Sequence, residues 1–107
     1  MSVSTHVLDA AKGIPAAGVP ITLTDSEGLV LTSSATDSDG RAEHLLPADS
    51  DPGVYRITFD TGNYFRSTGT VGFYPEVTVA FTVTDPSSHH HVPLLLSPFA
   101  FSTYRGS

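Results

Sequence analysis

Hydrophobic and polar side chains alternate along several short segments of the chain, which is the pattern of half-buried β-strands. The alternation is clearest between Val77 and Val83, where every second residue is hydrophobic and the residues between are Thr or Ala. Gly, Pro and Asp separate the segments, so each strand is short. The pattern predicts strands over residues 2–9, 19–24, 29–35, 53–59, 76–84, 89–97 and 100–105, with a shorter one after Arg41. This spacing predicts a two-sheet antiparallel sandwich of seven or eight strands.

One segment, residues 60–68, has the features of a helix. Asp60 or Thr61 can cap its N-terminus, and Gly69 can end it. Tyr64 and Phe65 give it an apolar face. We therefore expect an all-β fold with one short helix of about two turns.

Length and composition agree with a small β-rich domain. The chain has 107 residues, of which 26 are Thr, Val or Ile, and these β-branched side chains fit a pleated sheet. We expect residues 1–107 to form a single domain. The longest apolar run, residues 92–96, is too short for a membrane span or for the apolar core of a signal peptide. These features predict a cytoplasmic protein.

Charge and cysteine content exclude several classes of function. Five Lys and Arg stand against eleven Asp and Glu, for a net charge of -6. Nucleic acids and anionic membranes both require a cationic face, so neither is an expected partner. The absence of Cys excludes a disulfide framework, a thiol nucleophile and a Cys-based zinc site.

Five histidines in so small a chain are the most informative residues. Along a strand over residues 89–97, His89 and His91 point to one side and His90 to the other. The first two could form a metal-binding pair with His6 as a third ligand. A solvated strand end or a polar sheet edge is the simpler interpretation, and spacing alone favours it.

The first predicted strand indicates where His6 lies. If Val3, Thr5 and Val7 face the core, then His6 faces outward, together with Ser4 and Leu8. Taken alone, this is an ordinary surface position.

Arg41 and the C-terminus complete the candidate chemistry. Arg41 follows an Asp-Gly turn, and its position alone indicates a solvated turn residue. Residues 97–107 keep a strand-like pattern to the end, which suggests that the last residues pack or have a function. No serine elbow is present to supply a covalent nucleophile. The chemistry that remains is a His acting as base on water, with Arg and Tyr binding an anionic substrate.

Short motifs are spread along nearly the whole chain. They are residues 4–9 (Ser-Thr-His-Val-Leu-Asp), Gly13 with residues 15–16, 39–41 (Asp-Gly-Arg), 53–61, 73–77, 91–98 (His-Val-Pro-Leu-Leu-Leu-Ser-Pro) and 104–107 (Tyr-Arg-Gly-Ser). In this order they resemble the transthyretin-related family of 5-hydroxyisourate hydrolases. The ending Tyr-Arg-Gly-Ser is the most specific motif, because it separates the hydrolases from the transthyretin hormone carriers.

The resemblance implies a function and a set of site residues. The reaction would open the six-membered ring of 5-hydroxyisourate at a cyclic amide and give 2-oxo-4-hydroxy-4-carboxy-5-ureidoimidazoline. His6, Arg41 and His91 would be catalytic, and His6, Arg41, Tyr104 and Ser107 would bind the substrate. No metal and no cofactor would be needed. The family forms a homotetramer of transthyretin-like sandwiches, with active sites at the contact between dimers.

Three other functions stay open at this point. A small-ligand carrier of the transthyretin type would share the fold without catalysis. A zinc-dependent hydrolase would use His6, His89 and His91. A sandwich that serves only as an interaction module would be monomeric, whereas the apolar Leu8, Pro93 and Leu95 on the outward face favour an oligomer. Which His acts as the base also stays open.

Overall fold

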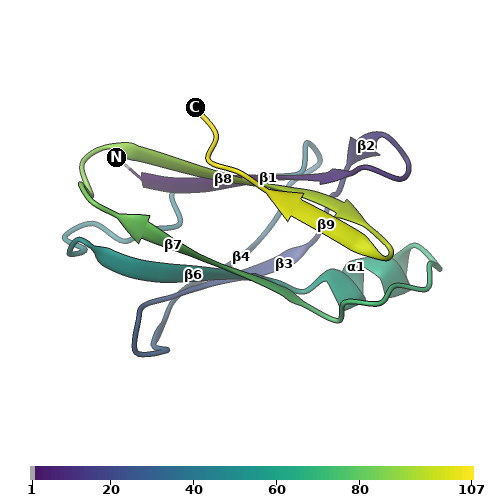
Figure 1. Ribbon diagram of the computed structural model, residues 1–107, viewed down its shortest axis with the longest axis horizontal. Helices are drawn as coiled ribbons and strands as arrows, with labels where there is room; N and C mark the ends of the chain where they lie inside the picture. Colours follow the sequence, from purple (N-terminus) through teal and green to yellow (C-terminus); the bar gives the residue numbers. More distant parts are fainter. Residues whose placement is uncertain (1) are drawn as a thin grey trace.

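A computed structural model describes residues 2–107 as two β-sheets packed face to face, with the helix at one end (Figure 1). Within these residues there are nine strands and one helix. Met1, part of the predicted domain 1–107, lies outside the described residues. The strands are β1 (Ser2–Asp9), β2 (Ile14–Pro15), β3 (Pro20–Thr24), β4 (Val30–Ala35), β5 (Arg41–Ala42), β6 (Gly53–Phe59), β7 (Val77–Val83), β8 (His89–Ser97) and β9 (Ala100–Thr103), and the helix is α1 (Thr61–Ser67).

The two sheets differ in size and in strand direction. One has the order β2-β1-β8-β9, with β5 also paired to β1, and the other has the order β4-β3-β6-β7. All pairs are antiparallel except β1 and β8, which run parallel. The predicted sandwich is confirmed, with two differences in detail. The two-residue strand β2 was not expected and brings the number to nine, whereas β5 is the short strand expected at Arg41. The parallel pair, β1 and β8, joins strands that no hairpin connects.

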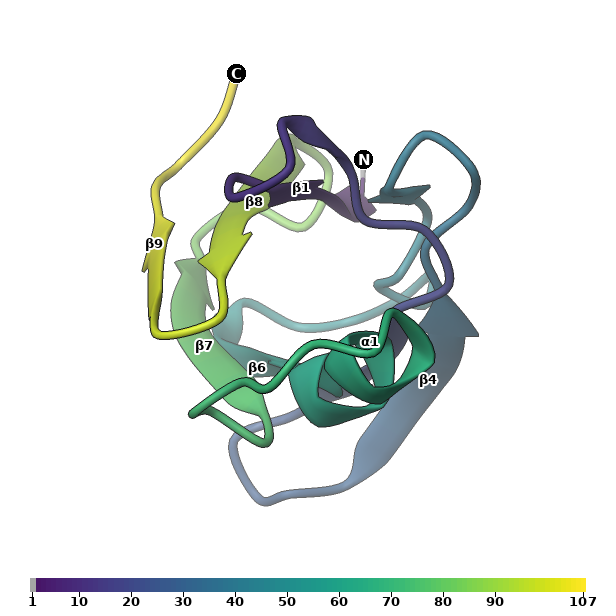
Figure 2. The ribbon, with the colours of Figure 1, turned by 90° about the vertical axis from the view of Figure 1, so that its right-hand side faces the viewer.

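The core lies between the sheets (Figure 2). Along β3, β6 and β7, more buried and less buried residues alternate, as the hydrophobic pattern predicts. In β1, Val3, Thr5 and Val7 are fully buried, which leaves the side chains of Ser4 and His6 on the outer face of the five-stranded sheet. The buried hydrophobic side chains that make up the centre of the core are Val3, Val7, Val19, Ile21, Leu23, Leu45, Ile57, Phe59, Val77, Val83, Leu94 and Leu96.

The helix begins and ends where the sequence predicts. The Asp60 side chain caps it by accepting a hydrogen bond from the Asn63 backbone N–H at 3.0 Å. Gly69 follows the helix with a φ of 67°, a conformation that suits glycine. Tyr64 and Phe65 are buried and hold the helix against the sheets. Within residues 2–107, no helix is long and apolar enough to cross a membrane.

A buried hydrogen bond ties the helix to the end of β1. The Tyr64 hydroxyl donates to Asp9 Oδ2 at 2.8 Å. The other carboxylate oxygen of Asp9 accepts from the backbone N–H groups of Ala11 and Lys12 at 3.1 and 3.0 Å. Burial, and then the adjacent carboxylate, raise the pKa of Tyr64 to about 12. Asp9 therefore anchors both the turn after β1 and the helix.

We expect Tyr64→Phe to lower the free energy of unfolding by about 1–3 kcal/mol, because it leaves a buried carboxylate oxygen without its donor. Denaturant unfolding at neutral pH measures this loss. Tyr74→Phe is the matched control, since that ring packs edge-on against Phe73 and Phe101 and the ring is kept. Its unfolding midpoint should stay within error of the unmodified protein.

The same pair also predicts a pH dependence. The folded-state pKa of Tyr64 lies above its ordinary value of 10, so its contribution is complete below pH 10 and is lost as the pH rises toward 12. Tyr64→Phe should remove that part of the alkaline loss. Equal alkaline profiles for the two proteins would show that folding does not raise the pKa of Tyr64.

Candidate functional site

The polar side chains singled out by the sequence gather on the outer face of the five-stranded sheet. In the parallel pair, Ser4 lies opposite His91. On the other side of β1, His6 lies opposite Arg41 of β5. The pairing of β1 with two different neighbours thus brings residues from three distant parts of the chain to one surface.

A tight turn orients His6 and Arg41. The Asp37 carboxylate accepts hydrogen bonds from the backbone N–H groups of Asp39 and Arg41, both at 2.9 Å. Gly40 has a φ of 76°, and a Cβ there would collide with the Val7 carbonyl oxygen. This explains why the Asp-Gly-Arg motif requires its glycine.

The turn also determines the tautomer of His6. Its Nε2 lies 2.9 Å from the Asp39 carbonyl oxygen. A carbonyl oxygen can only accept, so Nε2 carries the proton. In neutral His6 the Nδ1 is then the nitrogen with a free electron pair.

Ser4 bridges two imidazoles of β8. Its hydroxyl oxygen lies 3.0 Å from His89 Nε2 and 2.8 Å from His91 Nδ1. The two rings are stacked, with centroids 6.1 Å apart and planes inclined by 19°. Although Ser4 belongs to the outer face, it is only 4% exposed. Both imidazoles are therefore held by one hydroxyl group.

A shallow pocket of about 170 Å³ lies over this cluster. Arg41, His91 and Ser107, three of the predicted site residues, line it. His6 pairs with Arg41 across β1 and β5 but is not among the residues that line the pocket. The full lining comprises Ser4, Thr5, Arg41, Glu43, His89, His91 and Ser107.

The surroundings of His91 favour its neutral form. Burial lowers the pKa of His91, and the nearby His89, Arg41 and His6 lower it further. The carboxylate of Glu43 acts in the opposite direction with a smaller effect. His91 is consequently unprotonated near neutral pH and has an electron pair available.

The C-terminal residues pack directly on His91. The Gly106 backbone N–H donates to the His91 carbonyl oxygen at 2.9 Å, beyond the end of β9. A Cβ at Gly106 would overlap the His91 ring and press on Pro93. This close approach brings Ser107 to the pocket. It also buries Pro93, which the sequence had led us to expect exposed beside Leu8 and Leu95; these two leucines are partly exposed.

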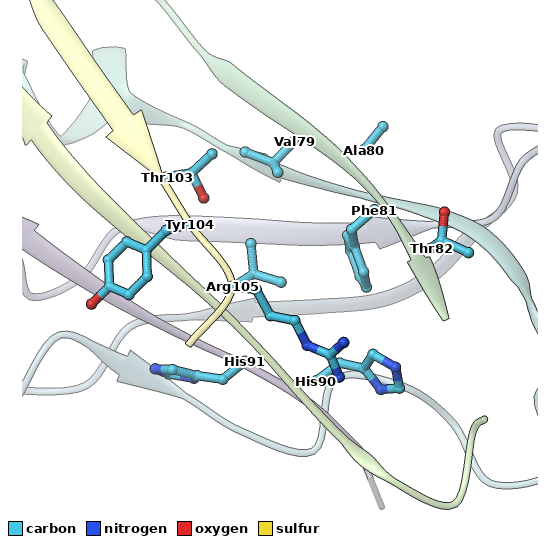
Figure 3. Close-up of a pocket in the computed structure, with 10 residues that line it drawn as sticks. Val79, Ala80, Phe81, Thr82, His90, His91, Thr103, Tyr104 and Arg105 are labelled. Atoms are coloured by element: carbon cyan, nitrogen blue, oxygen red, sulfur yellow. The ribbon is translucent and has the colours of Figure 1, made fainter. Parts of the chain in front are cut away.

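Tyr104 lies in a neighbouring cavity of about 260 Å³ between the open edges of the two sheets (Figure 3). His91 lines both cavities. The rings of Tyr104 and His91 extend to the same side, whereas Arg105 extends toward His90. Tyr104 is 57% exposed, so it is accessible to a ligand on the outer face.

His90 faces away from the cluster, as predicted. It is buried, and its Nδ1 lies 3.2 Å from the Ser88 carbonyl oxygen. Its Nε2 is buried with no hydrogen-bond partner among the described residues. The alternation along β8 therefore separates His90 from His89 and His91.

The structure adds residues that the sequence analysis did not single out as site residues. Ser4 and Gly106 both contact His91, and Glu43 lines the pocket. The strand pattern already placed Ser4 on the face of His6, but nothing local indicated its partners. Across residues 2–107, no three His, Cys, Asp or Glu side chains come together in an arrangement that could hold a metal ion. The trio His6, His89 and His91 is thus not assembled as a metal site within one chain.

Comparisons with known proteins show which relatives share this fold and sequence. A curated 5-hydroxyisourate hydrolase of Mus musculus is 46% identical over 110 residues, covering 97% of this chain and 93% of the mouse protein. The structure of Klebsiella pneumoniae 5-hydroxyisourate hydrolase matches with a TM-score of 0.89 and 34% identity, covering 99% of this chain and 93% of that one. Sea bream transthyretin in complex with thyroxine matches with the same TM-score and 30% identity, covering 99% of this chain and 95% of the transthyretin chain.

The shared sequence extends along nearly all of the described chain. Residues 3–106 match the sequence model of the HIUase/Transthyretin family. That range contains His6, Arg41, His91 and Tyr104, and it ends at the residue before Ser107. The chain therefore belongs to the HIUase/Transthyretin family.

Proposed function

We propose that this protein is a hydrolase of urate degradation, which opens 5-hydroxyisourate to 2-oxo-4-hydroxy-4-carboxy-5-ureidoimidazoline. The observation that carries the proposal is the pocket in which a neutral imidazole, His91, faces the same space as the guanidinium of Arg41. The names of the curated relatives support the same activity. Residues 1–107 act as one hydrolase domain in this proposal, and the cytoplasmic location stays a prediction of the sequence.

His91 is the base in the proposed reaction. Its Nδ1 is occupied by Ser4, so Nε2 is the nitrogen that takes a proton from water. The activated water attacks the amide carbonyl carbon of the substrate, and His91 returns the proton to the ring nitrogen that is released. General-base assistance of this kind contributes roughly 10²–10⁴-fold. No step requires a metal or a cofactor.

The other predicted site residues bind and polarise the substrate. Arg41 offers planar N–H donors to the carbonyl oxygen, where negative charge develops during the attack. The free Nδ1 of His6 accepts a hydrogen bond from the substrate beside Arg41. Tyr104 and Ser107 bind the substrate from the C-terminal segment.

A ligand carrier without catalysis is the second candidate. The equal fit to a transthyretin structure means that the fold does not separate carrier from enzyme. The side chains distinguish the two functions. A carrier does not require a neutral imidazole, an arginine and the Tyr-Arg-Gly-Ser ending at one surface. These residues favour the hydrolase.

We expect His6→Ala, Arg41→Ala and His91→Ala each to lower turnover of 5-hydroxyisourate at least tenfold while the fold survives, because all three lie on the solvated face. The substrate is generated in situ from urate, and its ultraviolet decay is followed with and without protein. Circular dichroism checks the fold of each variant.

His90→Tyr is the control for this series, since His90 belongs to the same run but faces the other side of β8. Its turnover should stay within twofold of the unmodified protein. No acceleration by the unmodified protein would reject the hydrolase in favour of the carrier. Loss of activity with a chelator would instead favour the zinc-dependent reaction.

We expect Gly106→Ala to lower turnover at least tenfold, because the added methyl group displaces either the His91 ring or residues 104–107. Gly69→Ala is the matched control: it lies after α1 with nothing near its Cβ, so it strains only its own backbone. Both variants should stay folded at room temperature. Normal turnover of Gly106→Ala would show that the close packing on His91 has no role in catalysis.

We also propose a homotetramer in which the outer faces of five-stranded sheets meet and enclose the active sites. Leu8 and Leu95 are partly exposed on that face. At the sheet edge, β9 pairs with β8 alone, and its four residues are all exposed and uncharged. Uncharged edge strands readily pair with other chains. Both surfaces thus suit contacts between copies of this chain.

Sedimentation equilibrium should therefore give the mass of four chains. Leu95→Lys places a charge on the proposed contact, so we expect a smaller assembly and at least tenfold lower turnover. Val54→Lys is the control, because Val54 is also an apolar surface residue but lies on the outer face of the other sheet. A stable, fully active monomer would contradict the tetramer.

A further inference from the structure

The hydrogen bonds of Ser4 form a continuous path between two imidazoles. Ser4 Oγ lies within 3.0 Å of a ring nitrogen of both His89 and His91. A hydroxyl group has one proton to donate. It donates to one ring, and it accepts from the other when that nitrogen carries a proton. The protonation states of the two imidazoles are therefore linked through Ser4.

The direction of the path follows from the role of His91. If His91 Nε2 is to take a proton from water, its proton must reside on Nδ1, which then donates to Ser4. The Ser4 hydroxyl consequently donates to His89 Nε2. His89 carries its own proton on Nδ1 and is exposed to solvent.

We propose that Ser4 is a positioning residue that holds His91 in its base-competent tautomer and relays the proton taken from water to exposed His89. The inference rests on the hydrolase function proposed above. When water gives a proton to His91 Nε2, the Nδ1 proton moves to Ser4 Oγ as the Ser4 proton moves to His89 Nε2. The reverse transfers return it through His91 to the departing ring nitrogen. Only O–H and N–H bonds form and break.

The surroundings of the two rings favour a proton on His89 over a proton on His91. A proton kept on His91 would lie in a partly buried place that His89, Arg41 and His6 make unfavourable for a cation, and Glu43 acts against them with a smaller effect. On His89 the same charge loses less hydration, because in the single chain that ring is more exposed than His91. Moving the proton along two hydrogen bonds thus removes the positive charge from the more buried ring while Arg41 binds the developing oxyanion.

The experiment compares Ser4→Ala, Ser4→Thr, His89→Phe and the double variant Ser4→Ala/His89→Phe. Ser4→Ala removes the path, whereas Ser4→Thr keeps the hydroxyl group. His89→Phe keeps an aromatic ring in the stack but cannot accept a proton. Ser34→Ala, on β4 of the other sheet, is the control for loss of an exposed hydroxyl.

The kinetic result expected is a loss in kcat with little change in KM. Ser4→Ala and His89→Phe should each lower kcat about tenfold, and Ser4→Thr should keep at least a third of normal kcat. The double variant should be no slower than the slower single variant, because both changes interrupt one path. Losses that multiply in the double variant would overturn the relay.

The pH profile gives a second readout that a merely structural role would not change. Neutral His91 is the active form, so kcat/KM rises with pH through the pKa of His91, which lies below 6.5. The groups that face His91 are His89, His6, Arg41 and Glu43. After burial, His89 lowers the pKa of His91 most, so His89→Phe should shift the acid limb toward higher pH. An unshifted limb with normal kcat would count against the proposal.

Long-range ¹⁵N–¹H NMR spectra of the substrate-free protein test the tautomer directly. We expect the proton of neutral His91 on Nδ1 in the unmodified protein and in Ser4→Thr, and loss of that preference in Ser4→Ala. A proton on Nε2 in the unmodified protein would overturn the proposal, whatever the activity. If Ser4→Ala does not fold, the exposed His89→Phe variant still decides the kinetic test. Absence of hydrolysis by the unmodified protein would instead reject the proposed function.

Discussion

Eight residues of β1 pair with eight of β8 in parallel register, and both the core and the reactive surface depend on that register. It sets Ser4 opposite His91 on the outer face, and it turns Val3 and Val7 inward, where they are fully buried. Because side chains alternate along a strand, a shift by one residue would exchange the two faces. The hydrophobic effect that specifies the core therefore also specifies which side chains meet at the site.

Two backbone contacts bring further residues to the surface that β1 and β8 form. The turn ordered by Asp37 delivers Arg41 beside His6, and the hydrogen bond from Gly106 to His91 brings the chain end over the same strand. Both contacts need a glycine, because a Cβ would meet the Val7 carbonyl oxygen at Gly40 and the His91 ring at Gly106. These contacts fix the positions of Arg41 and of the chain end around His91. A general base and an anion-binding group need such a constant geometry.

The same sandwich serves proteins with different activities. A 5-hydroxyisourate hydrolase and a thyroxine-binding transthyretin fit this chain equally well in three dimensions. Fold similarity alone is therefore not informative about catalysis, and the distinction has to come from the side chains of the site. Here the neutral imidazole of His91, held by Ser4 and placed near Arg41, is the chemical feature that favours hydrolysis.

Local pattern alone determined the strands, the ends of the helix and the outward facing of His6 and His91, because the two-residue period of a strand and the caps of a helix are properties of neighbouring residues. Motif resemblance added the residues that we expect to form the site. Only the tertiary structure decided the parallel direction of β1 and β8, the bridge made by Ser4 and the separate cavity of Tyr104. Ser4 and its two histidine partners lie 85 and 87 residues apart in the chain. Contacts over such separations depend on which strands become neighbours in the folded sheet, and no local sequence signal specifies that.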